Sequence, residues 1–275
     1  MDPILQALVI GIVQGLTEFL PISSSGHLIV VPYLFGWTDP FLTSLAFGVV
    51  LHVATLVALL VYFWRDWARL VPAGLATIRD RSFAGDPDRK LAWMIAATMP
   101  PAIVAGLLLN DFFEKEVRQP VLVALTLVVG AAILSVTDRL GRRTAGMEGL
   151  GFGGAFFVGC AQALALVPGI SRSGISISAG LAVGLTREAA ARFSFLMAAP
   201  IIAGAGAYEI RKLLTGEAGV AVEPGPLVVG FIAAAVSGLV AIAGLLRYLR
   251  GHPMTIFVAY RLALAVVVVV YFLNA

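Results

Sequence analysis

Long uninterrupted runs of apolar residues dominate the chain. Six of them, at about 42–63, 91–109, 120–138, 189–210, 226–246 and 255–273, approach or exceed the ~20 residues that an α-helix needs to cross a bilayer. The runs do not alternate between apolar and polar positions, as the strands of a membrane β-barrel do. Because lipid cannot satisfy open backbone groups, the pattern predicts an all-α polytopic membrane protein with six transmembrane helices.

Two further apolar segments are interrupted by proline, glycine and serine. Residues 4–20 lead to Pro21 and the sequence Ile-Ser-Ser-Ser-Gly at 22–26, and a shorter apolar run then ends at Phe35. Residues 152–167 lead to the sequence Pro-Gly-Ile-Ser-Arg-Ser-Gly at 168–174, followed by a run to Gly184. These short halves do not comfortably span ~30 Å of hydrocarbon at ~1.5 Å per residue. Each segment therefore predicts a re-entrant pair of short helices.

The two interrupted segments match each other at a constant offset of 148 positions. Seven of the sixteen residues from Gly11 to Gly26 recur in 159–174, and Phe47 matches Phe195. Each segment is followed by three of the predicted spans. The sequence therefore predicts an internal duplication within a single membrane domain, 1–275, with repeat one at about 1–140 and repeat two at about 150–275.

The basic residues between the spans predict an orientation. If loop 64–90 lies in the cytoplasm, thirteen lysines and arginines lie on that side, and four, Lys115, Arg118, Arg211 and Lys212, lie outside. This bias is typical of membrane proteins. Three spans per repeat make the second repeat inverted, so the break at 21–26 enters from outside and the break at 170–174 from inside. The two tips are then expected to meet near the midplane, as in transporters built from inverted repeats.

Composition agrees with a membrane protein and argues against other classes. Of the 275 residues, 60% are hydrophobic and 13% are charged, whereas about a quarter of a soluble domain is charged. The net charge of +3 comes from basic residues between the spans, so it indicates membrane topology and not nucleic-acid binding. The single cysteine, Cys160, cannot form an internal disulfide.

Polar residues at the first break are candidate functional groups, because polar groups inside a bilayer are costly. They are Gln14, Glu18, Ser23, Ser24, Ser25 and His27, with Gly26 between them. Gln14 and Glu18 are four residues apart and are expected on one helix face. The serines are expected to cap the following helix, whose N-terminus favours an anion.

The second break supplies Ser171, Arg172, Ser173, Gly174 and Ser176 in the same arrangement. Arg172 is a permanent cation whose planar fork suits phosphate oxygens. If the tips meet, two helix N-termini, an arginine, a carboxylate, a histidine and several hydroxyls form a site that suits a phosphate group. A hydroxyl beside a carboxylate or an imidazole can act as a nucleophile. Glu18 can instead hold a divalent cation that bridges the phosphates.

Other polar residues have plain structural interpretations. His52 lies in a span without a charged neighbour in sequence, so we expect it to pack. Arg261 lies about seven residues inside the last span, and we expect it to snorkel or to pair with a residue such as Asp138. The charges of 64–90 are expected to be solvated loop residues.

At these residues the chain resembles the undecaprenyl-diphosphate phosphatase family of bacteria, also called the bacitracin-resistance protein family. The resemblance covers essentially the whole chain and rests on 14–27, 168–176 and Phe193–Leu196 with Pro200. It implies hydrolysis of undecaprenyl diphosphate to undecaprenyl phosphate and inorganic phosphate, which regenerates the lipid carrier for cell-wall synthesis and confers bacitracin resistance. It also implies dependence on Mg²⁺ or Ca²⁺, and a multi-pass protein of the cytoplasmic (inner) membrane whose active site opens to the extracytoplasmic side.

By motif position, the resemblance implies that Ser24 is the nucleophile and that Arg172 binds the diphosphate. Glu18 and His27 are its acid–base or metal-associated residues. The substrate-binding residues are expected to be Gln14, Ser23, Ser25, Gly26, Ser171, Ser173, Gly174 and Ser176. The family pattern has Glu or Gln where this chain has Gln14, which weakens a two-carboxylate metal site. It usually has Thr where this chain has Ser176.

Several alternatives stay open. A phosphoserine intermediate and direct attack by water both fit the residues, as do Glu18 and His27 as the base. A polyisoprenyl-phosphate flippase or a small-anion secondary transporter is the alternative function, because it shares the inverted repeat and the midplane anion site. The expected partners are a polyisoprenyl diphosphate and membrane lipids, without nucleic acid. A homodimer is open too, because Gly204 and Gly206 permit close helix contacts.

Overall fold

The computed structural model describes residues 1–116, 119–215 and 222–274. Along these residues the chain forms α-helices and contains no β-strand. The helices are α1 Pro3–Phe19, α2 Ser24–Phe35, α3 Leu45–Tyr62, α4 Trp64–Asp80, α5 Pro87–Ala97, α6 Met99–Glu116, α7 Pro120–Leu140, α8 Phe152–Ala163, α9 Arg172–Ala182, α10 Arg187–Leu214, α11 Pro224–Leu249 and α12 Thr255–Asn274. Two short 3₁₀ turns, η1 Met147–Gly149 and η2 Leu164–Leu166, flank α8.

Six stretches within the described residues are long and apolar enough to cross a membrane. They are Leu45–Tyr62, Pro87–Leu108, Val121–Leu140, Arg187–Tyr208, Pro224–Leu249 and Thr255–Asn274. The second stretch combines α5 and α6, which meet at Thr98. These stretches coincide with the six predicted spans, so the predicted polytopic all-α class is confirmed.

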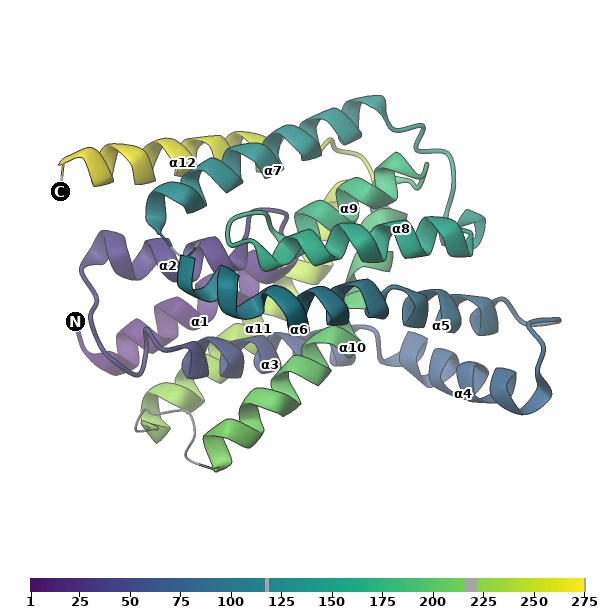
Figure 1. Cartoon of the computed structure of the whole chain (residues 1–275), viewed down its shortest axis with the longest axis horizontal. Helices are drawn as coiled ribbons and strands as arrows, with labels where there is room; N and C mark the ends of the chain where they lie inside the picture. The colour runs from purple at the N-terminus through teal and green to yellow at the C-terminus, as the bar shows by residue number, and fades with distance from the viewer. Residues whose placement is uncertain (117–118, 216–221, 275) are drawn as a thin grey trace.

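The two predicted helix pairs are present as hairpins of short helices, α1–α2 and α8–α9. Figure 1 shows that α1–α2 enters from the end that carries both termini and α8–α9 from the opposite end, so that their turns approach each other in the middle. The caps of α2 and α9 are Ser23 and Ser171, whose φ angles are 75° and 73°. Each cap hydroxyl accepts a hydrogen bond from the N–H three residues on, at 3.2 Å from Gly26 and 3.1 Å from Gly174. The predicted serine caps are therefore confirmed at both breaks.

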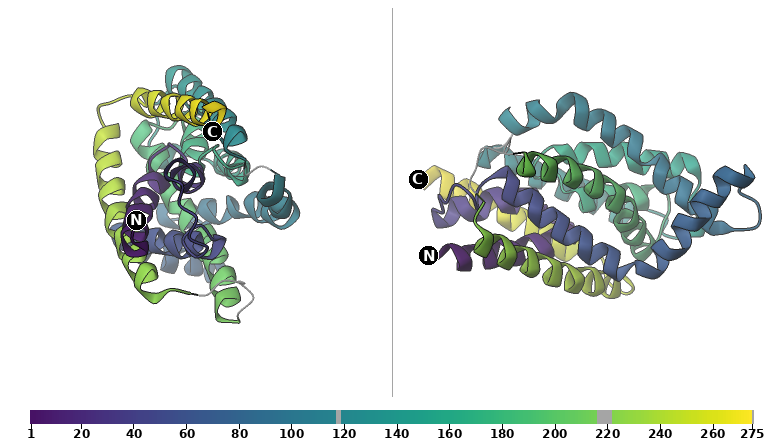
Figure 2. Two further views of the ribbon diagram at one scale, coloured as in Figure 1. Left: turned by 90° about the vertical axis from the view of Figure 1, so that its left-hand side faces the viewer. Right: turned by 90° about the horizontal axis from the view of Figure 1, so that it is seen from below.

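The helices of the two predicted repeats pack against each other in pairs. The hairpin helix α1 packs along α11, and α8 packs along α6. The long helices α3 and α10 also pair, as do α7 and α12, which lie side by side in Figure 2. The internal duplication itself stays a prediction. These cross-half pairs, and the order of a hairpin followed by three spans, are what a duplication would produce.

Small residues allow α1 and α11 to touch backbone to backbone. A side chain added at Gly11 would collide with the backbone of Gly230, and one at Gly15 would collide with that of Ala234. Such small residues are how transmembrane helices approach closely. The contact fixes the position of α1, which carries Gln14 and Glu18 on the adjoining face.

The expectation for residues 64–90 is wrong. Trp64–Asp80 form α4, and Asp66 is buried and accepts hydrogen bonds from Arg69 at 3.0 Å and Arg192 at 2.7 Å. Closely spaced charged residues occur on the polar side of a helix as well as in loops. Of the basic residues predicted outside, Arg118 lies outside the described residues, as do the side chains of Lys115 and Lys212.

Arg261 neither snorkels nor pairs with Asp138, contrary to expectation. Asp138 accepts hydrogen bonds from Arg187 at 2.5 and 3.1 Å and from the N–H of Met254 at 3.0 Å. Arg261 is fully buried and donates to backbone carbonyls instead. The acceptors are Leu127 on α7 at 3.1 Å, and Gly169 and Ile170 at 2.9 and 3.0 Å, with Pro21 at 3.5 Å. A broken helix leaves carbonyls without intrahelical donors, and a guanidinium offers five N–H groups.

The two glycines proposed for helix contacts differ. An added Cβ at Gly206 would lie 2.7 Å from Val53, so this glycine serves packing within the chain. At Gly204 an added Cβ meets no atom within 4 Å. The homodimer stays a prediction.

Candidate active site

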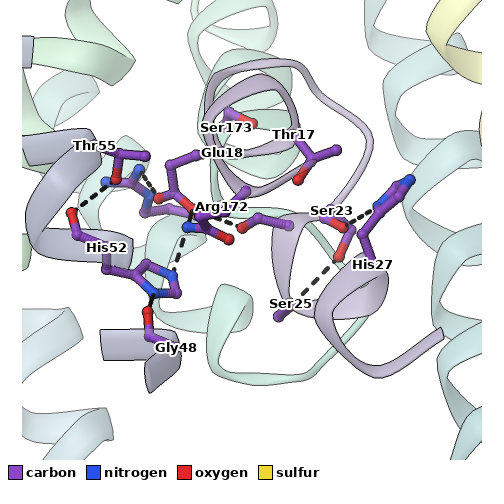
Figure 3. Close-up of polar contacts among 12 residues, drawn as sticks. Thr17, Glu18, Ser23, Ser25, His27, Gly48, His52, Thr55, Arg172 and Ser173 are labelled. Atoms are coloured by element: carbon purple, nitrogen blue, oxygen red, sulfur yellow. Dashed lines mark hydrogen bonds and ion pairs between the residues drawn. The ribbon is translucent and has the colours of Figure 1, made fainter. Parts of the chain in front are cut away.

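Glu18 is the centre of a polar cluster where the two hairpin tips meet (Figure 3). It is buried at the end of α1. Its Oε1 accepts a hydrogen bond from Arg172 Nη2 at 2.6 Å. Its Oε2 accepts from Gln14 Nε2 at 2.9 Å and from Ser24 Oγ at 2.6 Å. The shared face of Gln14 and Glu18 is thus confirmed. The donors compensate a buried carboxylate that would otherwise be very costly.

Ser24 and Arg172 reach Glu18 because each is the first residue of a helix. The left-handed backbone of the preceding serine turns the chain sharply, so that α2 and α9 both begin at the cluster. First-turn N–H groups have no intrahelical acceptor and carry the positive end of the helix dipole. Arg172 Nη1 is buried and has no hydrogen-bond partner within the described part of the chain. The tips therefore offer unused donors to an anion.

The remaining serines hold the tips in place. Ser173 Oγ donates to Leu20 O at 3.0 Å and so joins the second tip to the first. Ser176 is buried, donates to Arg172 O at 2.6 Å and lies 2.6 Å from Ser194 Oγ. Ser23 and Ser25 lie 3.3 Å apart between their hydroxyl oxygens. The structure thus places Ser173 and Ser176 behind the tip, where their hydroxyls contact protein groups.

His27 points away from Glu18 (Figure 3). Its Nδ1 lies 2.6 Å from Ser23 O, and its Nε2 lies 2.8 Å from the hydroxyl oxygen of Tyr260 on α12. A carbonyl only accepts, so Nδ1 carries a proton, and Nε2 shares a hydrogen bond with the Tyr260 hydroxyl. Both ring nitrogens are therefore engaged at the α2–α12 contact, and the structure does not bring His27 to Ser24.

His52 joins the cluster, so the expectation that it only packs is wrong. Its Nδ1 lies 2.8 Å from Gly48 O on the same helix, and its Nε2 lies 3.4 Å from Glu18 Oε2. Gly48 O only accepts, so Nδ1 carries the proton of that hydrogen bond, and Nε2 is the ring atom that lies beside the Glu18 carboxylate. The sequence held one signal for this role, since a histidine inside an apolar span is itself costly. Its partner lies on α1 and is not visible from α3 alone.

The oxygen atoms of the cluster fit a divalent cation that is bound jointly by the protein and by a substrate. Hard cations such as Mg²⁺ and Ca²⁺ take oxygen ligands. Glu18 supplies a carboxylate, and Gln14 Oε1 is buried without a hydrogen-bond partner. No group of three or more His, Cys, Asp or Glu gathers anywhere in the part of the chain that the structure describes. The cluster therefore suits a cation that draws most of its ligands from phosphate and water.

The fold and the site define a multi-pass membrane protein with a buried polar cluster between two helix N-termini. The chain belongs to the family described as bacitracin resistance protein BacA, whose model matches residues 7–267. The turns of both hairpins lie within this range.

Several relatives are named undecaprenyl-diphosphatase. The chain is 43% identical over 274 residues to one from Desulforudis audaxviator, covering 98% of each chain. It is 44% identical over 269 residues to one from Moorella thermoacetica, again covering 98% of each. It is 45% identical over 262 residues to one from Alcanivorax borkumensis, covering 95% of this chain and 96% of the other.

Proposed function

We propose that this chain hydrolyses undecaprenyl diphosphate to undecaprenyl phosphate and inorganic phosphate. The family and the shared name of the relatives support this reaction. The observation that carries the proposal is the 2.6 Å hydrogen bond from Ser24 Oγ to Glu18, next to Arg172. It couples a nucleophile to a base beside a cation that suits phosphate. The reaction recycles the lipid carrier of cell-wall synthesis, which accounts for bacitracin resistance.

In the proposed mechanism Ser24 Oγ attacks the terminal phosphorus, and the proton of the Ser24 hydroxyl passes to Glu18. The bond from that phosphorus to the bridging oxygen breaks, and the leaving undecaprenyl phosphate receives this proton from Glu18. A water then attacks the phosphoserine and gives its proton to Glu18, which returns it to the departing Ser24 oxygen. Arg172 and the first-turn N–H groups stabilise the charge on the equatorial oxygens. Direct attack by water is the alternative, and it leaves no phosphate on Ser24.

Glu18 is the proposed base because it already accepts the Ser24 hydrogen bond. His27 is hydrogen-bonded through both ring nitrogens to Ser23 and Tyr260. A general base must be within hydrogen-bonding reach of the proton that it takes. In this proposal His27 shapes the first tip, and Glu18 moves the proton.

We also propose a role for Mg²⁺ or Ca²⁺, held by Glu18 and Gln14 Oε1 together with the substrate. When bound, the cation would neutralise charge on the diphosphate. Arg172 Nη1 supplies a further contact to phosphate that does not depend on the metal.

The proposed orientation places both termini on the extracytoplasmic side of the cytoplasmic membrane. The hairpin α1–α2 enters from that end (Figure 1), and the proposal is that the cluster is reached from there. The excess of basic residues at the opposite end, thirteen against four, supports this choice.

The test is release of inorganic phosphate by the purified protein in detergent. Farnesyl or undecaprenyl diphosphate serves as substrate, with Mg²⁺, with Ca²⁺ or with a chelator. We expect release that depends on a divalent cation and that Ser24→Ala and Arg172→Ala each abolish. Ser237→Ala is the matched control, because Ser237 lies on α11 outside both tips and its hydroxyl donates to Ala233 O of the same helix at 2.6 Å.

A folded wild-type protein that binds the lipid diphosphate but releases no phosphate would refute the enzyme. Transport of a polyisoprenyl phosphate across vesicles by the same sample would then favour the flippase. Mass spectrometry of the Ser24 peptide after rapid quenching separates the two mechanisms, because only the phosphoserine route leaves phosphate on that residue.

A further inference from the structure

Two large cavities lie at the ends of the membrane-spanning helices, apart from the candidate active site. One, of about 510 Å³, is lined by Tyr62, Phe63, Trp64, Arg65, Asp66, Arg69 and Arg192. The other, of about 490 Å³, is here called the arginine pocket. It is lined by Arg142, Arg143, Thr186, Arg187, Glu188, Leu249 and Arg250.

The charges of the arginine pocket are incompletely neutralised. Arg187 pairs with Asp138, and Arg250 lies 3.0 Å from Glu188. Arg142 makes no hydrogen bond or ion pair within the described part of the chain, and Arg143 donates to the carbonyl of Gly141 at 3.3 Å. Two guanidinium groups therefore face the pocket without a carboxylate partner among the described residues.

The other cavity differs in this respect. Asp66 accepts hydrogen bonds from both Arg69 and Arg192, and Arg65 lies 5.3 Å from the centre of the Trp64 ring. Its cations thus already have partners within the chain. Among the described residues, two guanidinium groups of the arginine pocket lack a carboxylate partner, against one, Arg65, in the other cavity.

The arginine pocket is also fixed in shape before any ligand arrives. The loop that carries Arg142 and Arg143 is joined to the turn before α10 by three backbone hydrogen bonds. Thr144 N and Ala145 N donate to Gly184 O at 3.1 Å, and Thr186 N donates to Ala145 O at 2.9 Å. Arg143 has a φ of 53°, a conformation that persists in a non-glycine residue when its surroundings impose it. A preformed pocket reduces the entropy lost on binding.

The position of the pocket indicates the source of the anion. Three membrane-spanning helices meet there, at the end of α7, the start of α10 and the end of α11, opposite the end with both termini (Figure 1). Beside it, Leu140 and Val136 of α7 are 78% and 53% exposed. A polar pocket at the ends of spans, next to an exposed apolar helix face, matches a lipid with its headgroup in the pocket and its chains along α7. Basic pockets between transmembrane helices bind anionic headgroups.

We propose that the arginine pocket binds the headgroup phosphate of an anionic membrane lipid. Arg142 and Arg143 supply the uncompensated charge, and the paired Arg187 and Arg250 complete the wall. This lipid is distinct from the proposed substrate, and its site is separate from the Ser24–Glu18 cluster. The proposal stands whether or not the chain is a phosphatase.

The experiment measures binding of a fluorescent phosphatidylglycerol to the purified full chain in mixed micelles, with phosphatidylcholine as the neutral reference. The test variant is Arg142→Ala with Arg143→Ala. The control is Arg79→Ala with Arg81→Ala, which removes the same charge at the end of α4 and also changes an arginine of positive φ, 51° at Arg81. We expect roughly thirtyfold weaker phosphatidylglycerol binding in the test variant, at about fivefold for each arginine, and unchanged binding in the control.

Equal binding by wild type and test variant overturns the proposal, as does an equal loss in the control, which would indicate a diffuse charge effect. Inorganic phosphate that competes at millimolar concentration would show a free-anion site and overturn the lipid assignment. If the alanine variant does not fold, Arg142→Lys with Arg143→Lys replaces it. Lysine keeps the charge but not the bidentate fork, so binding is expected to fall severalfold, and unchanged binding counts against the pocket.

Discussion

The two hairpin tips share a turn but differ in the residue that faces Glu18. The sequences 22–26 and 170–174 are identical except at the middle position, which is Ser24 in the first tip and Arg172 in the second. The preceding serines have φ angles of 75° and 73°, and each caps its helix in the same way. The repeated residues therefore build the turn. The one that differs gives each tip its own chemical group.

This comparison shows why two equal tips would not make the proposed site. Two serine tips would hold no cation for a phosphate, and two arginine tips would hold no nucleophile. The carboxylate also occurs in only one of the two segments, since the position that corresponds to Glu18 in the second segment is Leu166. Two turns of the same shape thus carry different chemical groups.

The largest effect should come from removing the group that is unique to the first tip. Ser24→Ala is expected to lower phosphate release by a factor on the order of a thousand or more, because the proposed nucleophile is lost. Steady-state phosphate release in detergent measures it. Ser237→Ala should stay within a fewfold of wild type. A Ser24→Ala protein with near-normal turnover would favour direct attack by water.

A second substitution makes the tips alike. Arg172→Ser copies the first tip into the second and should lower kcat/KM by about a hundredfold or more, since it removes a charged donor to the equatorial oxygens. Arg172→Lys should recover part of this loss, because it restores the charge without the fork. Equal rates for the serine and lysine variants would mean that the charge of Arg172 is not used.

His52 tests whether a residue outside both tips belongs to the centre. His52→Ala should lower turnover about tenfold through loss of the polar ring beside Glu18, and His52→Gln should recover most of it because its amide donates a hydrogen bond at the same place. The comparison uses kcat at saturating substrate, with the unfolding midpoint as a check on folding. If alanine and glutamine variants lose activity equally, the ring itself and not its donor is required.

The smallest effect concerns the shared turn. Ser23→Ala and Ser171→Ala should each lower the free energy of unfolding by about 1 kcal/mol through loss of the cap, and by similar amounts. Ser→Gly at the same positions should cost less, because glycine accepts a positive φ. Denaturant titration in detergent measures both. Clearly unequal losses would contradict the equivalence of the two turns.

The sequence was sufficient for the features that are local. Span positions follow from the length of apolar runs, and the caps at Ser23 and Ser171 follow from serines that precede glycine at a helix start. The contact between Gln14 and Glu18 follows from helical spacing. These features depend on neighbours within a few residues, so they could be read from one segment at a time.

The features that were missed depend on partners far along the chain. His52 was interpreted as a packing residue because Glu18, its partner, lies on another helix. Asp138 was predicted to pair with Arg261, but its ion pair is with Arg187. Arg261 instead donates to carbonyls of the second helix break, at Gly169 and Ile170, and to one carbonyl of α7, at Leu127. One segment of the sequence does not show that the two helix breaks expose backbone carbonyls at the same place in the fold.

The clamp formed by Arg261 also bears on how the protein is made. Arg261 lies on α12 and donates to Gly169 and Ile170 at the second tip, while approaching Pro21 at the first. Synthesis runs from the N-terminus, so both tips are translated well before this arginine leaves the ribosome. The nascent chain therefore passes through a stage in which both hairpins exist without their common support. Completion of the proposed active site therefore requires α12, which is the last helix to be inserted.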